Sequence, residues 1–210
     1  AYYNSQFIDT RGDLGILVDL GRIHRIDAMQ LYGYNIIDAG GTFSARTPGN
    51  FTIWTATSDA AITTSGGALL VDDIGMFAQH GMEFGMNDPG ASATTGETYL
   101  FGNAAQPPEV TDEEPDVVTA ETVFARYIFL RDLEPIETNP ADENIVGLAE
   151  VQFYGFSLGD INLDGSVNLL DVSPFIELLS GGEYNVFGDI NFDGSVNLLD
   201  VQPFIDILTG

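Results

Sequence analysis

The sequence predicts a mainly β protein, with a β-sandwich over residues 14–157 followed by a small α-helical module over residues 158–210. Two observations lead to this prediction. Runs of β-branched and aromatic residues, separated by loops rich in Gly, Asn and Asp, recur up to residue 155, as they do in β-sandwiches. The last part of the chain instead contains a 23-residue segment written twice, and each copy ends in an apolar run with helical spacing.

The expected strands of the sandwich follow one another between Gly- and Asn-rich loops. Residues 1–13 precede them and contain β-type residues without a turn signal, so we expect an N-terminal arm or strand there. The segment 58–122 is rich in long loops, which in a compact domain tend to be functional or covered by a partner. The predicted strands are 15–21, 24–34, 50–59, 125–133 and 146–155.

The two copies, residues 159–181 and 188–210, are 29 positions apart and identical at 18 of 23 positions. In each copy, oxygen-bearing side chains stand at positions one, three, five, nine and twelve of a loop, with glycine at six. Calcium takes about six to eight oxygen ligands, and a loop of this length supplies them from alternate residues and from the carbonyl at position seven. The glycine permits the sharp turn, and the position-nine Asn is expected to act through a water.

Asp, Asn and Gly clusters also make simple turns, but two matching copies argue against that alternative. The sequence therefore predicts two calcium ions in the tail. The predicted ligands are Asp160, Asn162, Asp164, Ser166, Asn168 and Asp171 in the first loop, and Asp189, Asn191, Asp193, Ser195, Asn197 and Asp200 in the second.

An apolar run follows each loop, over residues 169–179 and 198–208, and is predicted to be helical. Pro174 and Pro203 lie inside these runs. Since proline removes one helical hydrogen bond, we expect one turn after each loop and then a restart, with the proline at the first helical position.

The duplicated pattern Asp-x-Asn-x-Asp-Gly-x-x-Asn-x-x-Asp, followed by short apolar helices, resembles a dockerin domain over about the last 52 residues. The resemblance implies two calcium loop–helix units with pseudo-twofold symmetry, one helix face of which docks on a cohesin, itself a β-sandwich. Clostridial dockerins carry small hydroxyl residues at positions ten and eleven, where this sequence carries leucine. The predicted partner-binding residues are Leu169, Leu170, Leu198 and Leu199, and the expected partner is a cohesin-like β-sandwich or another copy of the chain.

The order of the strand sequences, with DLG near residue 20, ARYI at 125–128 and GLAEVQFYG at 147–155, resembles a discoidin or coagulation-factor type C domain. The resemblance implies an eight-stranded jelly roll, often a sugar or lipid binder, and leaves open a further structural calcium in the sandwich. Trp54 is a candidate sugar platform, although its place in a strand favours a core position.

The charge of the chain limits its partners. The net charge is −26 at pH 7, which opposes binding to nucleic acid. No apolar run approaches membrane-spanning length, so no membrane insertion is expected. Cysteine is absent, so calcium rather than disulfides would stabilise the fold in the expected extracellular or cell-surface location, after removal of a signal peptide. The acidic residues at 112–116 are interpreted as a solvated loop rather than another cation site.

No catalytic constellation is visible in the sequence. His24 and His80 have no Ser, Cys or Glu partner at a recognisable spacing, and neither a phosphate loop nor a zinc-type histidine cluster occurs. We therefore expect no enzymatic activity.

The junction between the two parts favours a structural role. Only residues 156–158 separate the last expected strand from the first loop, and three residues span about 10 Å at most, so the tail is expected to pack against the sandwich. We therefore predict an extracellular, calcium-dependent assembly protein whose subunits join through the tail, the N-terminal strand or both into a fibre or surface layer. The alternatives are a carbohydrate-binding module anchored to a cohesin-type scaffold and a fragment of a secreted enzyme whose catalytic domain lies elsewhere.

Overall fold

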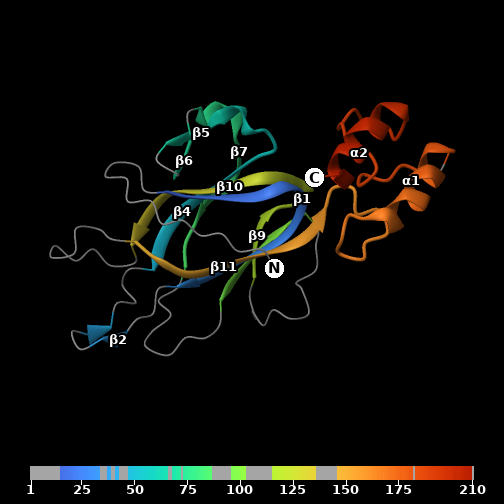
Figure 1. The fold of residues 1–210 in the computed structure, drawn as a ribbon. Helices are drawn as coiled ribbons and strands as arrows, with labels where there is room; N and C mark the ends of the chain where they lie inside the picture. Colours follow the sequence, from blue (N-terminus) through green and yellow to red (C-terminus); the bar gives the residue numbers. More distant parts are fainter. Residues whose placement is uncertain are drawn as a thin grey trace. The chain divides into compact units, whose positions relative to one another are not determined.

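The computed structural model of the chain describes residues 15–33, 37–38, 41–42, 47–65, 68–71, 73–86, 96–102, 115–135, 146–181 and 183–209. The chain forms two compact units, the first comprising Ala1–Gly21 and Ile26–Tyr154 and the second Arg22–Arg25 and Gly155–Gly210. The first is rich in sheet and the second carries two short helices, which confirms the predicted mainly β class with a helical tail (Figure 1). The predicted arm 1–13 and the acidic residues 112–114 lie outside the described residues.

The strands of the first unit vary widely in length. The longest is β1, Gly15–Gly33, which unites the two strands predicted over 15–21 and 24–34. The other strands that build the main sheet are β4 (Pro48–Ala56), β7 (Ala78–Phe84), β8 (Glu97–Phe101), β9 (Asp116–Thr119), β10 (Val123–Pro135) and β11 (Leu148–Ser157). Two short ladders pair β2 (Ile37–Asp38) with β3 (Gly41–Thr42) and β5 (Ile62–Ser65) with β6 (Ala68–Val71), and short 3₁₀ turns η2 (Asp59–Ala61) and η3 (Ile74–Met76) flank the second ladder.

The main sheet has the strand order β7-β4-β10-β1-β8-β9, and β11 pairs with β1 outside this path. The β4–β10, β4–β7 and β1–β8 pairs are antiparallel, whereas β8 and β9 are parallel. Because β1 is 19 residues long, it has room for three neighbours and joins the whole sheet. Gly21 has φ of +82°, a conformation that only glycine adopts readily, and it marks the irregular point inside this long strand.

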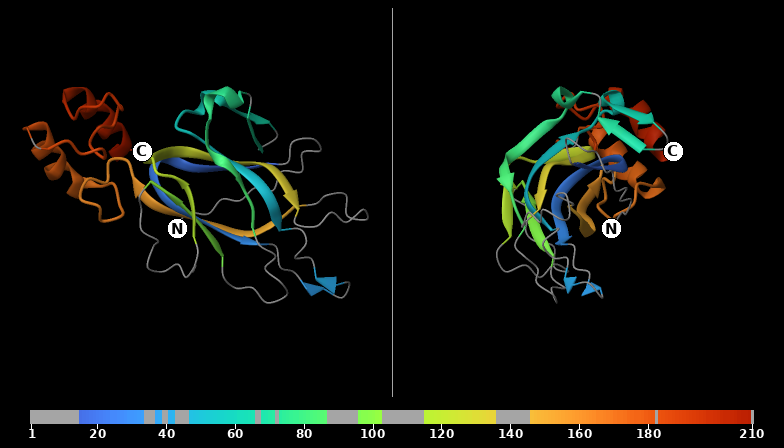
Figure 2. Two further views of the ribbon diagram at one scale, coloured as in Figure 1. Left: turned by 180° about the vertical axis from the view of Figure 1, so that it is seen from behind. Right: turned by 90° about the vertical axis from the view of Figure 1, so that its left-hand side faces the viewer.

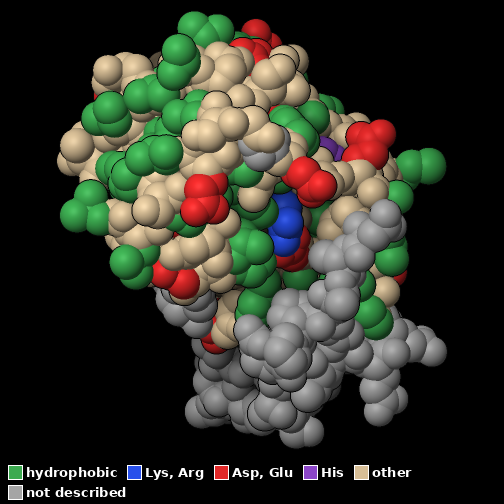
Figure 3. Space-filling model, turned by 90° about the vertical axis from the view of Figure 1, so that its right-hand side faces the viewer, with side chains coloured by type: hydrophobic (Ala, Val, Ile, Leu, Met, Phe, Trp, Pro, Cys, Tyr) green, Lys and Arg blue, Asp and Glu red, His purple; other side chains and the backbone are tan. Residues whose placement is uncertain are grey.

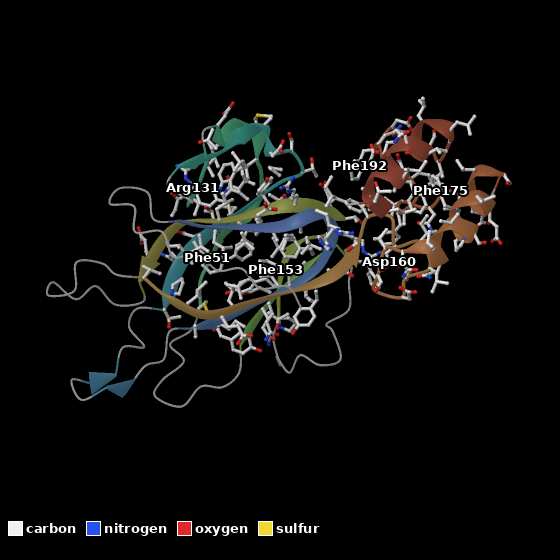
Figure 4. The ribbon with its side chains drawn as sticks, in the orientation of Figure 1. Phe51, Arg131, Phe153, Asp160, Phe175 and Phe192 are labelled. Atoms are coloured by element: carbon white, nitrogen blue, oxygen red, sulfur yellow. The ribbon has the colours of Figure 1, made fainter. Side chains whose placement is uncertain are left out.

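The sheet is strongly curved and encloses the main core (Figure 2). Phe51 and Phe153 lie inside this curve, from β4 and β11 (Figure 4). The ring of Phe51 meets the ring of Tyr99 edge to face at a centroid distance of 5.4 Å. Such aromatic pairs add a preferred geometry to the burial of apolar surface, which is the main stabilising term of the unit.

A second, smaller cluster lies on the other face of β4 and β10, where η3 and the β5–β6 ladder contribute apolar side chains. Its buried members include Phe77 and Tyr127, and the half-buried Trp54 packs against them. The indole Nε1 of Trp54 donates a hydrogen bond to Thr52 Oγ1 at 2.9 Å, and the guanidinium of Arg131 lies 5.9 Å from the ring. This packing supports the core interpretation of Trp54 over the sugar platform.

A bidentate ion pair links β1 to β10. Arg126 donates from Nε to Asp19 Oδ1 at 2.9 Å and from a terminal nitrogen to Asp19 Oδ2 at 3.1 Å, while the N–H of Gly21 donates to Oδ1 at 2.8 Å. Burial acts to raise the pKa of Asp19, but the hydrogen bonds from Arg126 and Gly21 and the charge of Arg126 outweigh it, so the pKa of Asp19 is lowered.

We predict that Arg126→Met destabilises the first unit by about 1 kcal/mol at neutral pH, because the paired side chains are partly exposed. The pKa of Asp19 is lower in the folded chain than in the unfolded chain. The stability that the ion pair provides is therefore complete above about pH 4, and it is lost as the pH falls through the pKa of Asp19 in the folded chain. Thermal unfolding of both chains across that range measures the difference. Asp59→Asn is the control, since this exposed carboxylate lies 3.9 Å from Arg126; an equal loss there would contradict the assignment.

Candidate calcium loops and docking surface

The second unit repeats one arrangement twice. A loop leads into a 3₁₀ turn, η5 (Leu169–Asp171) or η6 (Leu198–Asp200), and then into an α-helix, α1 (Val172–Leu179) or α2 (Val201–Thr209). This turn followed by a helix agrees with the expected turn and restart. The prolines, however, stand third in each helix rather than first. The N–H of that residue has no partner within a helix, so proline breaks no helical hydrogen bond there.

The core of the second unit is built from equivalent positions of the two copies. The rings of Phe175 and Phe204 meet at a centroid distance of 4.3 Å, and both are buried. Two further sets of equivalent positions, 29 residues apart, are also buried in both copies: Leu158 and Phe187, and Ile161 and Ile190. The repeated sequence therefore folds into repeated structure, in which neither copy would bury its phenylalanine alone.

In the first loop, two fully buried carboxylates accept hydrogen bonds from the backbone. Asp160 accepts from the N–H groups of Asp164 and Gly165 at 3.1 and 2.9 Å. Asp171 accepts from Ile161 at 2.8 Å through Oδ1 and from Asn168 at 2.9 Å through Oδ2. The positions one and twelve of the predicted loop are thus drawn inward by the backbone between them.

The second loop reproduces most of these bonds. Asp189 accepts from the N–H groups of Asp193 and Gly194 at 3.1 and 3.0 Å, and Asp200 accepts from Asn191 and Asn197 at 3.1 and 2.9 Å. Asp189 and Asp200 are also buried. The close agreement between the two copies indicates that the loop geometry follows from the shared sequence.

The remaining side chains of each loop form a more exposed rim. In the first loop, Asn162 accepts from the N–H of Asp164 at 2.9 Å, and Asp164 accepts from the N–H of Ser166 at 3.0 Å. Asn168 has a function that the sequence analysis missed: its side chain accepts from the N–H of Leu170 at 2.8 Å and caps η5. Asn197 caps η6 in the same way. The sequence signature of this cap is an Asn three residues before an Asp at the start of an apolar run, as in a capping box.

The donor chemistry of both loops suits a hard cation. Among the described residues, no group of three or more His, Cys, Asp or Glu side chains is arranged to hold a metal ion. Each loop has only three carboxylates, so a complete oxygen shell would also need Asn side chains and a main-chain carbonyl. Burial raises the pKa of Asp160, and the negative charges of Asp171 and Asp164 act in the same direction, against the hydrogen bonds that lower it. A cation would offset these like charges, so the residues fit calcium.

Four leucines at positions ten and eleven of the loops stand out from the surface. Their exposed fractions are 80% for Leu169, 66% for Leu170, 80% for Leu198 and 67% for Leu199. Figure 3 shows hydrophobic side chains standing among acidic ones on this unit. Leu163 and Phe192, at position four, are also exposed and have φ of +58° and +59°, a conformation that L side chains rarely adopt. The unit thus displays apolar surface twice, at equivalent positions.

The short segment Arg22–Arg25 is part of the second unit, which the sequence did not predict. The guanidinium of Arg25 lies 5.2 Å from the ring centroid of Phe156 and 4.9 Å from that of Phe187. The N–H of Leu158 donates to the carbonyl of Ile23 at 3.0 Å. These contacts join residues more than 130 positions apart, and nothing in the local sequence indicates them.

Each of the two histidines lies beside a hydroxyl group. His24 Nδ1 lies 3.2 Å from Ser157 Oγ, and both residues are buried, so substrate could not reach them. His80 Nε2 lies 2.6 Å from Thr55 Oγ1, and burial lowers the pKa of His80 despite the opposing charge of Glu121. The two contacts engage the buried hydroxyls of Ser157 and Thr55 within the fold.

Together, the two loop–helix copies and their shared core form a tandem loop–helix module. Residues 158–208 match the family model of the Dockerin type I domain. Dockerin type I domains are non-catalytic modules that bind Ca²⁺ and cohesin partners and are typically extracellular or at the cell surface. No helix among the described residues is long and apolar enough to cross a membrane. A comparison with curated proteins gave no match.

Comparison with solved structures found the C-terminal domain of a chitobiase from Bacteroides fragilis, at 11% identity and a TM-score of 0.40 over 69% of this chain and 64% of that one. A fragment labelled as a chitobiase from Bacteroides thetaiotaomicron gave 10% identity and a TM-score of 0.39 over 71% of this chain and 65% of that one. This chain therefore spans less than two thirds of either. The discoidin-like jelly roll predicted for the first unit is not confirmed by these comparisons.

We predict that Arg25→Met weakens the second unit by about 1–2 kcal/mol, because it removes a partly buried cation from two aromatic rings while keeping an apolar stem. Amide hydrogen exchange over residues 158–208 in the full chain measures the change. Arg22→Met is the matched control, because Arg22 belongs to the same segment and is exposed. Equal acceleration of exchange in both variants would refute a specific role for Arg25.

Proposed function

We propose that the tail binds two calcium ions, one in each loop, through Asp160, Asn162, Asp164, Ser166, Asn168 and Asp171 and through the residues 29 positions later. The support is the paired burial of carboxylates in a segment, residues 159–210, that contains nine acidic residues and no basic one. Calcium would supply the positive charge that the segment lacks. Because the same Asp171 carboxylate accepts from the backbone of Asn168, which caps η5, cation binding and helix formation would be coupled.

We predict that the double variant Asp164→Ala, Asp193→Ala takes up no calcium and loses the stability that calcium provides. At a calcium concentration 100 times Kd, a bound ion stabilises the folded tail by about 2.7 kcal/mol per site. Calorimetric titration measures the uptake, and circular dichroism measures the loss of helix.

The matched control for this variant is Glu177→Gln, Asp206→Asn, which also removes two acidic charges but from exposed helix positions outside the loops. Calcium uptake should persist there. Unchanged uptake in the Asp164→Ala, Asp193→Ala chain would show that these loops are not the sites.

We propose that the chain functions as an extracellular, calcium-dependent assembly protein, whose tail docks on a cohesin-like β-sandwich through Leu169, Leu170, Leu198 and Leu199. The single observation that carries this proposal is their exposure, between 66% and 80%, at the same two positions of both copies. Apolar side chains this exposed lose contact with water only if a partner covers them. Leucine in place of a hydroxyl residue means that the partner would offer an apolar surface rather than hydrogen-bonding groups.

Docking of the tail would then bring the first unit into an assembly. We infer no enzymatic activity for this segment, because the sequence carries no recognisable catalytic motif. Sugar binding gains no support from Trp54, which packs into the second core cluster. Joining into a fibre through the N-terminal strand stays a prediction, because residues 1–13 lie outside the described residues.

We predict that changing all four leucines to Ser abolishes binding to a cohesin module that binds the unmodified chain in calcium, a loss of at least about 100-fold for two or more buried leucines. Surface plasmon resonance against a panel of cohesin modules, with and without a chelator, measures this. Met82→Ser is the control, because Met82 is exposed on β7 in the first unit. Binding that survives the leucine changes would exclude this surface. Calcium-dependent self-association in sedimentation, lost in the same variant, would instead identify a second copy as the partner.

A further inference from the structure

The two loops differ in the donors to the carboxylate at position one. Asp189 Oδ2 accepts two hydrogen bonds, from the N–H of Gly194 at 3.0 Å and from the hydroxyl of Tyr184 at 2.9 Å. The equivalent oxygen of Asp160 accepts from the N–H of Gly165 at 2.9 Å. The residue 29 positions before Tyr184 is Gly155, which has no side chain, so the first loop cannot form the second bond from that position.

The tyrosine is held by a short turn that leads into the second loop. Asn185 Oδ1 accepts from the N–H of Phe187 at 2.9 Å, and the N–H of Gly188 donates to the carbonyl of Asn185 at 2.9 Å. Phe187 is buried, and its carbonyl accepts from the N–H of Gly159 at 3.1 Å. Tyr184 is therefore attached to a turn that the core of the second unit fixes, although its own side chain is exposed.

The extra bond restricts how Asp189 can meet a cation. A carboxylate oxygen has two lone pairs, and both lone pairs of Asp189 Oδ2 are engaged by the two donors. Among the described residues, Oδ1 accepts from the N–H of Asp193 at 3.1 Å, which leaves a lone pair of this oxygen for a cation. In the first loop, by contrast, Oδ2 of Asp160 is engaged by one donor, so the carboxylate is less firmly oriented.

The phenol remains a hydrogen-bond donor near neutral pH. Burial raises the pKa of Tyr184, and so do the hydrogen bond to Asp189 and the negative charges of Asp189, Asp193 and Asp200. These three carboxylates are the acidic positions one, five and twelve of the second loop. The tyrosine thus lies within the field of the whole predicted ligand set.

We propose that Tyr184 is a positioning residue of the second loop, which it makes the tighter of two unequal calcium sites. The inference rests on the proposed function of the loops. Donors that orient a ligand without touching the metal commonly change metal affinity by about 10- to 100-fold, and one exposed phenol should act near the lower limit. Calcium would therefore fill the second loop before the first.

The experiment titrates calcium into the ¹⁵N-labelled full chain and follows the amide signals of Gly165 and Gly194 by nuclear magnetic resonance. These amides donate to Asp160 and Asp189, so each reports on its own loop. In the unmodified chain, the Gly194 signal should change at lower calcium than the Gly165 signal. In Tyr184→Phe, the Gly194 midpoint should move to about tenfold higher calcium, while the Gly165 midpoint stays nearly constant.

Tyr154→Phe is the matched control, because it removes a hydroxyl that donates to Gln152 at 2.6 Å in the first unit, and it should change neither midpoint. Equal midpoints in the unmodified chain, or an unchanged ratio of midpoints in Tyr184→Phe, would overturn the inference. If calcium moved neither glycine signal, the calcium proposal itself would fail, which is a different result. Retained chemical-shift dispersion of the other tail amides confirms that Tyr184→Phe is folded.

Discussion

Four aspartates, Asp160, Asp171, Asp189 and Asp200, are buried within a segment that has no basic residue. Burying an ionised carboxylate is unfavourable unless hydrogen bonds or an opposite charge compensate. Backbone N–H groups provide the first kind of compensation in both loops. They leave the net negative charge in place. A bound cation would supply the second kind, and the remaining features of the proposed tail function would depend on that cation.

The dependence follows from the capping arrangement. Asn168 and Asp171 form a reciprocal capping box at η5, and Asn197 and Asp200 repeat it at η6. The helix of each copy therefore starts at a residue that is also a predicted ligand. The exposed leucines lie in these turns, directly between the capping residues. Loop, helix start and docking surface are consequently one local structure rather than three, and an ion that orders the loop would also fix the leucines.

The sequence predicted the tail well because its determinants are local. Position-specific oxygens, a glycine at six and helical apolar spacing all fall within 23 residues, and the duplication removes chance matches. The contacts it missed join distant segments: Arg25 with Phe156 and Phe187, and His24 with Ser157. Such pairs depend on how the chain folds back, and neither periodicity nor spacing carries that information.

The first unit was predicted less completely for a related reason. Strands β4, β10 and β11 carry long apolar patterns and were expected within a few residues of their observed bounds. Strands β7, β8 and β9 lie in the region expected to be mainly loops. They are short, with at most seven residues each, so their side chains give too few alternations to identify a strand. Sheet order is harder still, because β1 pairs with β8 more than 60 residues away.

The negative charge of the chain and the exposed leucines of its tail have opposite effects on association. Exposed apolar side chains favour nonspecific association, whereas a net charge of −26 opposes it by repulsion between copies of the chain. Fully burying a leucine contributes about 1.5–3 kcal/mol, so four leucines could hold a partner only if most of them were covered at once. Apolar contact has little directional preference. The choice of partner would therefore depend on the shape of the surface that receives the leucines and on a rim that tolerates the acidic residues around them.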